Sequence, residues 1–159
     1  MAAISADPEV MRWVGDGSVR DKQQIRSGVE AMERAWEAQG FGLFAEEVRS
    51  TGEPAGFTGL STPHYLPEVL PAVETGWRLG RSHWGQSLAT EAAAAAVRFG
   101  FQDCVLDRIV SIAQVGNGAS ERNMAKLGMH PLRETVDPSC GRRVRILALS
   151  SDRYVTATH

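Results

Sequence analysis

The chain has 159 residues, of which 43% are hydrophobic and 23% are charged, as is typical of one soluble globular domain with a hydrophobic core. Its formal net charge of -2 gives no electrostatic reason to expect a nucleic acid or an anionic membrane as a partner. Cys104 and Cys140 show neither zinc-ligand nor disulfide spacing, and the sequence contains no secretory signal, so we expect one cytoplasmic domain over residues 1–159 with no metal.

The first half of the chain predicts a helix followed by a β-hairpin. Ser18 to Asp21 has the form of a capping box, and apolar residues then recur at helical spacing as far as Gly40. Residues 41–48 and 55–60 are rich in strand formers and flank a turn with glycine and proline, which predicts the hairpin. The segment STPHYLPEVLP is expected to be a loop because of its three prolines, and AVETGWRL a third strand.

The second half of the chain predicts two helices and three strands. Four residues lie on one face of a helix that runs to about Asp103, namely Leu88, Ala92, Ala95 and Phe99. Residues 108–115 predict a strand, residues 119–127 a short helix ending at Gly128, and residues 129–136 and 142–150 two more strands. The arginines at 142, 143 and 145 are expected to form a solvated strand face. This order predicts an α/β domain with a mixed central sheet flanked by helices.

The stretch HWGQSLATEAAAAA, residues 83–96, places small residues in a turn directly before an alanine-rich helix. Gly85, Ser87 and Ala89 would let the backbone approach a ligand closely, and the helix start directs unpaired N–H groups at the same point. This favours an anion site, most simply for a pyrophosphate. A tight turn without a ligand explains the same pattern. A dinucleotide-binding module is excluded because the Gly-x-Gly-x-x-Gly spacing is missing.

Three ordered motifs carry a family resemblance: WRLGRSHWGQSLATEAA, DRIVSIAQVGNGAS and ERNMAKLGM. Together with DPEVMRWVG near the start of the chain, they resemble the GNAT superfamily of acyl-CoA-dependent N-acetyltransferases, specifically its RimJ/RimL-like branch. The resemblance implies the GNAT fold and transfer of an acetyl group from acetyl-CoA to a primary amine by direct attack in a ternary complex. The acceptor would be a protein N-terminus or a small-molecule amine.

The resemblance also implies which residues contact acetyl-CoA. The strand from Glu74 to Leu79 would splay from its neighbour, so that peptide groups of Trp77 and Leu79 pair with the pantetheine arm and the Leu79 N–H polarises the thioester carbonyl. Backbone N–H groups of the turn would hold the pyrophosphate, namely those of Gly85, Gln86, Ser87, Leu88, Ala89 and Thr90. Asn117 either contacts the cofactor's arm or caps the next helix.

Ser87 departs from the family pattern, since the branch normally has glycine at this position. A serine N–H is expected to serve the ligand only if the backbone there has a negative φ. The serine hydroxyl is an alternative donor to a phosphate oxygen.

Acyl transfer to an amine requires an acceptor for the amine's proton. Glu74 is the candidate base, acting directly or through a water molecule; the alternative is an exposed strand glutamate without a catalytic role. Ser120 is the candidate donor to the leaving thiolate, because Met124 occupies the place of the tyrosine that many relatives use; the alternative is a helix-start hydroxyl. Glu91 is expected to be structural and His83 to be a surface residue.

Two expectations concern the whole chain. Relatives normally begin with a strand, whereas this sequence starts with MAAISADPEV, inside the region of the family's first helix, so the first strand is expected to be missing. A sheet edge left bare in this way is a template for pairing with another chain, which predicts a homodimer. The alternative function is a non-catalytic acyl-CoA-binding or regulatory domain on the same scaffold, favoured by Ser87 and by Asn123 in place of an apolar residue.

Overall fold

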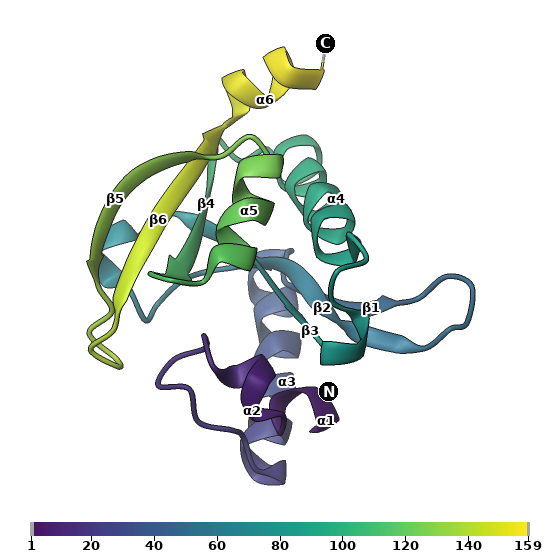
Figure 1. Ribbon diagram of the computed structural model, residues 1–159. Coiled ribbons are helices and arrows are strands. Elements are labelled where there is room, and N and C mark those ends of the chain that lie inside the picture. The colour runs from purple at the N-terminus through teal and green to yellow at the C-terminus, as the bar shows by residue number, and fades with distance from the viewer. Residues whose placement is uncertain (1, 159) are drawn as a thin grey trace.

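The computed structural model describes residues 2–158, which form a six-stranded sheet of order β1-β2-β3-β4-β6-β5 with helices packed around it (Figure 1). The strands are β1 (Leu43–Glu47), β2 (Pro54–Ser61), β3 (Val73–Leu79), β4 (Arg108–Gln114), β5 (His130–Val136) and β6 (Arg143–Ser150). The helices are α1 (Ala2–Ser5), α2 (Pro8–Met11), α3 (Lys22–Gln39), α4 (Leu88–Gln102), α5 (Gly118–Lys126) and α6 (Ser151–Thr158). The α/β fold with a mixed sheet is therefore confirmed.

The joint between β3 and β4 is the feature of the sheet that matters most for function. All neighbouring strands are antiparallel except these two, which are parallel and connected through α4. They pair only at Val73 with Ile109 and at Glu74 with Val110. Beyond Glu74 the two strands separate, so the sheet opens between an antiparallel half β1-β2-β3 and an antiparallel half β4-β6-β5.

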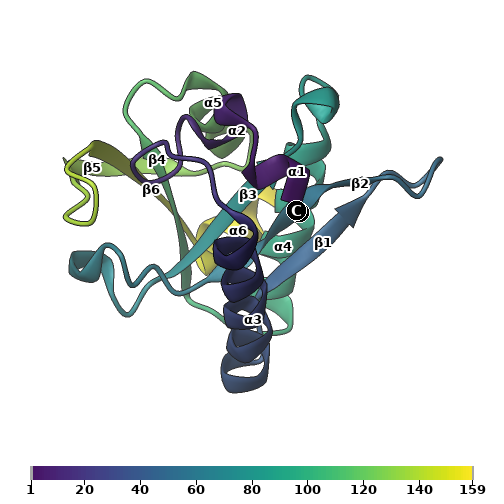
Figure 2. The ribbon, with the colours of Figure 1, turned by 90° about the horizontal axis from the view of Figure 1, so that it is seen from below.

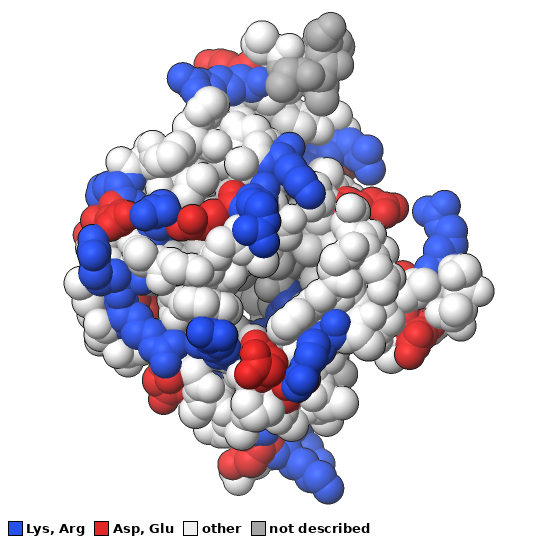
Figure 3. All heavy atoms as spheres, in the orientation of Figure 1, with Lys and Arg blue, Asp and Glu red and all other residues white. Residues whose placement is uncertain are grey.

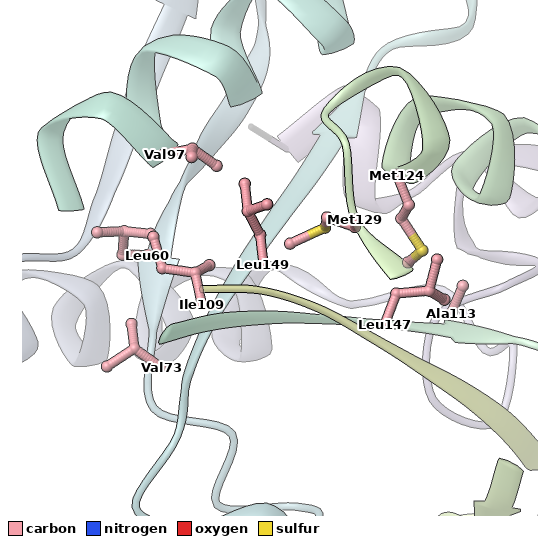
Figure 4. Close-up of a cluster of buried hydrophobic side chains, with 9 residues drawn as sticks. All are labelled: Leu60, Val73, Val97, Ile109, Ala113, Met124, Met129, Leu147 and Leu149. Carbon is pink, nitrogen blue, oxygen red and sulfur yellow. The ribbon is translucent and has the colours of Figure 1, made fainter. Parts of the chain in front are cut away.

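Both faces of the central strands are buried, each by its own cluster of apolar side chains. The cluster on the side of α4 and α5 is shown in Figure 4 and consists of Leu60, Val73, Val97, Ile109, Ala113, Met124, Met129, Leu147 and Leu149. The cluster on the opposite face includes Leu66 and Val69 from the proline-rich loop, packed on alternate residues of β4 and β6. Because side chains alternate along a strand, Val73 places Glu74 on the loop side of the sheet.

The helix α4 lies close to the sheet because its inner side carries small residues. It buries Ala93, Ala96, Val97 and Gly100, and a Cβ at Gly100 would lie only 2.8 Å from the side chain of Ile109. The predicted inner face of this helix was only partly right: Phe99 packs against the hydrophobic cluster, but Ala95 is exposed and the buried face is rotated by one position. Alanine on nearly every side leaves little hydrophobic periodicity from which to choose a face.

The helix α3 begins at a capping box that lies three residues later than predicted. Asp21 accepts a hydrogen bond from the Gln24 backbone N–H at 2.8 Å, and the Gln24 side chain accepts one from the Asp21 N–H at 2.9 Å. Ser18 cannot cap the helix because its N–H and hydroxyl both donate to Asp16. Gly40, with a φ of 75°, ends the helix as predicted.

The N-terminal helices α1, α2 and α3 gather at one end of the molecule, opposite α6, and lie toward the viewer in Figure 2. No strand precedes them among residues 2–42, so β1 and β5 are the two edges of the sheet. Within the part of the chain that the structure describes, no helix is both long enough and apolar enough to cross a bilayer.

Candidate active site

A cavity of about 1020 Å³ opens where β3 and β4 separate. Its mouth is visible as a hollow near the centre of the face shown in Figure 3. All the residues predicted to form the site line it, namely Glu74, Trp77, Leu79, Gly85, Gln86, Ser87, Leu88, Ala89, Thr90, Asn117 and Ser120. The fold therefore brings together β3, the turn before α4 and the start of α5.

The backbone of β3 presents unpaired N–H groups to this cavity. The Gly80 N–H donates to the Ala55 carbonyl at 2.8 Å, and hydrogen bonding to an antiparallel neighbour alternates from residue to residue. The peptide groups of Trp77 and Leu79 consequently face away from β2. Since β4 has already separated from β3 at this level, the N–H groups of Trp77 and Leu79 are directed into the opening.

Two backbone carbonyl groups on the same side of β3 accept hydrogen bonds from side chains. The Ser111 hydroxyl donates to the Thr75 carbonyl at 3.0 Å, and the Trp84 indole N–H donates to the Leu79 carbonyl at 3.0 Å. Trp84 is 48% exposed at the edge of the cavity. The first bond connects β3 to β4 next to their joint, and the second holds the turn before α4 against the end of β3.

The turn before α4 has two residues in the left-handed region, Gly85 with a φ of 73° and Ser87 with a φ of 61°. Glycine adopts this conformation freely, whereas a residue with a Cβ is strained by about 1–2 kcal/mol. The condition of a negative φ at Ser87 is therefore not met, and serine takes the backbone conformation that favours glycine. Its side chain makes no capping bond to α4.

Asn117 and Ser120 are bonded to each other at the start of α5. The Asn117 side-chain oxygen accepts from the Ser120 backbone N–H at 3.3 Å, and the Asn117 amide donates to the Ser120 hydroxyl oxygen at 3.1 Å. Asn117 thus caps the helix while lining the cavity. Because the Ser120 oxygen accepts in this pair, its hydroxyl hydrogen is available to another acceptor.

Asn123 has a structural partner that the sequence did not reveal. The Thr90 hydroxyl donates to the Asn123 side-chain oxygen at 2.7 Å and so connects the first turn of α4 to α5. Met124, the next residue, is buried in the hydrophobic cluster.

Glu74 lies on β3 with its carboxyl group directed to the cavity side that faces the proline-rich loop. The Tyr65 hydroxyl donates to Glu74 Oε1 at 2.8 Å. Burial raises the pKa of Glu74 to about 7; the Tyr65 hydrogen bond lowers it and the charge of Asp137 raises it further. A carboxylate with a pKa near neutrality is suited to accept a proton at physiological pH.

A family model described as an acetyltransferase (GNAT) domain matches residues 1–130. This chain belongs to the GNAT acetyltransferase family. The match covers all of the cavity-lining segments from the N-terminus through α5.

The chain is also similar to individual relatives and to solved structures. The chain is 34% identical to the Bacillus subtilis protein YkkB over 78% of this chain and 70% of YkkB. It is 28% identical to the N-acetyltransferase p20 of Bacillus licheniformis over 72% of this chain and 63% of p20. The crystal structure of a GNAT-family acetyltransferase from Bacillus anthracis superposes with a TM-score of 0.77 at 20% identity, over 96% of this chain and 87% of the other, which supports the fold. The chain is thus an N-acetyltransferase, and the enzyme is favoured over the non-catalytic alternative.

Two residues near Glu74 in this GNAT acetyltransferase were missed by sequence reasoning. Tyr65 lies in the proline-rich loop, and Asp137 lies between β5 and β6, yet both line the cavity near Glu74. Neither segment carries a spacing pattern that would reveal them. His83 was predicted to be a surface residue, and this was wrong, because a short turn over Arg81–His83 folds it inward until it is only 8% exposed.

On the other side of the cavity, α5 contributes the cations Arg122 and Lys126. Their charge makes this part of the cavity favourable for an anion. Among residues 2–158, no three His, Cys, Asp or Glu side chains gather in a way that would hold a metal ion.

Proposed function

We propose that this GNAT domain transfers the acetyl group of acetyl-CoA to a primary amine by direct attack in a ternary complex. The observation that carries the proposal is the separation of β3 from β4, which leaves the N–H groups of Trp77 and Leu79 facing the cavity. GNAT acetyltransferases use acetyl-CoA, which supplies the acetyl group as a reactive thioester. An extended pantetheine arm can pair with such a strand as an added strand would.

The remaining contacts to acetyl-CoA are proposed for the turn and α5. Backbone N–H groups of Gly85, Gln86 and residues 88–90, at the start of α4, are suited to hold the pyrophosphate. Ser87, whose φ is positive, would contribute its hydroxyl instead. Arg122 and Lys126 add positive charge nearby. The amide of Asn117 is placed at the same cavity and is proposed to contact the pantetheine arm.

Glu74 is proposed to take the proton that the acceptor's ammonium group must lose, directly or through a water molecule. The freed amine nitrogen then forms a C–N bond to the acetyl carbon while the C–S bond breaks. The Leu79 N–H donates to the carbonyl oxygen as negative charge develops there. Ser120 donates a hydrogen bond to the leaving sulfur, which takes up the second proton lost by the nitrogen. The products are an acetylated amine and the free thiol of CoA.

Finer assignments belong to the same proposal. The RimJ/RimL-like branch rests on the WGQSLATEAA turn and the LGM that ends α5, and acceptors in that branch include protein N-termini and small amines. A single domain over residues 1–159, a cytoplasmic location and a homodimer are also proposed.

Binding of acetyl-CoA is the first test. Calorimetry should show binding, and thermal unfolding should shift upward because a ligand selective for the native state stabilises it by about 2.7 kcal/mol at a hundredfold excess over Kd. NAD and ATP at the same concentration should shift the transition much less. Equal shifts from all three ligands would contradict the assignment of the donor.

Release of free thiol from acetyl-CoA, measured across a panel of primary amines and N-terminal peptides, is the second test. Glu74→Gln should lower kcat by about 10²–10⁴-fold with the affinity for acetyl-CoA nearly unchanged. Glu37→Gln, on the exposed side of α3, is the matched control and should behave as wild type. Unchanged turnover in Glu74→Gln would remove Glu74 from the proposed chemistry.

A further inference from the structure

One face of β3 presents a carboxylate, an open position and a guanidinium in succession. Glu74, Gly76 and Arg78 share this face because they alternate along the strand, and all three line the cavity. A Cβ at Gly76 would meet no atom within 4 Å, so the space above the middle of the strand is free. The Cα atoms of Glu74 and Arg78 are about 13 Å apart at the usual rise of an extended strand. This face of β3, formed by Glu74, Gly76 and Arg78, is the floor of the cavity and carries opposite charges at its two ends.

Among the residues that the structure describes, Arg78 has no anionic partner. Its Nε is buried without a hydrogen-bond partner, and its Nη1 makes one long bond, of 3.4 Å, to the Ser5 hydroxyl. The guanidinium lies over the ring of Phe57 at 4.9 Å. Burial and the nearby charge of Arg20 lower the pKa of Arg78 to about 10, so the group remains charged at neutral pH. A buried charge of this kind is costly unless an opposite charge compensates it.

Arg20 is a second cation of the same cavity without an ion pair. Its Nη1 donates to the carbonyl and hydroxyl of Ser18, and its charge acts on the nearby carboxylate of Asp16 without forming a close ion pair. Among the described residues, neither Arg20 nor Arg78 lies within 4.0 Å of a carboxylate, whereas Arg81 and Arg145, outside this floor, do form ion pairs. Both of these unpaired cations therefore line the cavity.

The opposite end of the floor is acidic. Glu74 is accompanied there by Asp137, which is 4% exposed and accepts hydrogen bonds from the backbone N–H and hydroxyl of Ser139. Like charges on these two carboxylates attract a cation. Along β3, acids thus lie at the end of Glu74 and arginines at the end of Arg78, while Glu9 of α2 is a further carboxylate in the lining of the cavity.

We propose that the acceptor is a zwitterion whose primary amine binds at Glu74 and whose carboxylate binds Arg78 and Arg20. This inference rests on the proposed acetyl transfer and names its substrate class. The spacing along β3 requires several bonds between the amine and the carboxylate, which fits an ω-amino carboxylate or a short peptide. Polyamines and simple alkylamines lack the group that Arg78 and Arg20 require.

The test compares three acceptors of equal length: ε-aminocaproate, its uncharged amide and hexylamine. With wild-type protein, kcat/KM should favour the carboxylate over the amide by about tenfold or more, as expected for a charge-assisted bond to a buried arginine. Arg78→Met should bring the carboxylate to the level of the amide and leave the KM for acetyl-CoA unchanged. Arg49→Met, in the exposed turn between β1 and β2, removes the same charge and should retain the preference.

Other outcomes overturn the inference without ambiguity. Equal kcat/KM for the carboxylate and the amide overturns the zwitterionic acceptor but leaves acetyl transfer standing, whereas no transfer to any amine counts against the proposed function. If no amine is acetylated, the zwitterionic acceptor is tested by calorimetry on protein saturated with CoA. Tighter binding of ε-aminocaproate than of its amide supports the zwitterionic acceptor, and equal binding or no binding overturns it. Should Arg78→Met fail to fold, Arg78→Lys keeps the charge and must retain part of the preference.

Discussion

The carboxyl group of Glu74 is subject to opposing influences from its neighbours. Removal from water favours the protonated form, and the charge of Asp137 acts in the same direction, while the hydroxyl of Tyr65 stabilises the ionised form. The pKa of about 7 is the balance of these effects. If Glu74 is the base, as proposed, Tyr65 is a positioning residue that acts through it.

Tyr65→Phe should shift the pH dependence of activity. Loss of the hydrogen bond removes the one contact that favours the carboxylate, so the pKa of Glu74 rises further and the acidic limb of the kcat/KM profile moves to higher pH. The profile measured with one acceptor between pH 5 and pH 9 checks this. In a Glu74→Gln background the same change should cause no shift, and a shift that persists there would show that Tyr65 acts on another group.

Ser87 allows a direct test of strain in the turn before α4. Ser87→Gly should raise the free energy of unfolding by about 0.5–1 kcal/mol, because relief of the left-handed strain exceeds the extra chain entropy of glycine. Ser87→Ala keeps the Cβ and should show no such gain in chemical denaturation. The alanine variant has a second use, since weaker binding of acetyl-CoA would show that the serine hydroxyl reaches a phosphate oxygen.

At the level of elements, the sequence predicted every strand of the sheet and the long helices, because each has a clear hydrophobic period or a turn at its end. It did not predict α1 or α6, since four or eight residues give too little periodicity to identify a helix, whereas α2 lies in the region that the family resemblance assigned to the first helix. The parts of the candidate site that depend on backbone N–H groups, in β3 and in the turn before α4, were predicted from the sequence. Tyr65, Asp137 and Arg78 were missed because only the tertiary fold brings them into the cavity.

Which face of α4 packs against the sheet can be tested by substituting two neighbouring alanines. Ala96→Leu should lower the free energy of unfolding by about 1–3 kcal/mol, because Ala96 is buried against the sheet and the larger side chain has no room. Ala95→Leu, on the exposed side, should change it by less than about 0.5 kcal/mol. Denaturant titration of both variants distinguishes the two faces, and the reverse ranking would restore the face predicted from the sequence.

At the scale of the whole molecule, the edge formed by β1 bears on assembly. Trp36 of α3 covers part of it, since its indole N–H donates to the Leu43 carbonyl at 2.9 Å and its ring packs against Phe44 at 4.8 Å. Ala45 is exposed further along the strand. The edge is therefore only partly protected by the chain's own residues.

The homodimer expected from such an edge remains a prediction. Light scattering over a wide range of concentrations should find twice the mass of one chain, and Ala45→Pro should shift the population toward monomer, because proline removes a backbone donor from the edge strand. Phe44 is adjacent but packs on Trp36 and Phe99, so it is left unchanged. A monomer at all concentrations in the wild type would contradict the prediction.

The short joint between β3 and β4 has a consequence for the order of folding. Residues 43–79 supply one half of the sheet and residues 108–150 the other, so each half is built from contacts between segments close together in sequence. Contacts of this kind close small loops and form early, whereas the joint must wait for α4 to bring the halves together. The cleft in which acetyl transfer is proposed is then the boundary between two folding units. Native-state hydrogen exchange should find the amide of Val73, which the alternation along β3 directs toward β4, opening before the amides within either half.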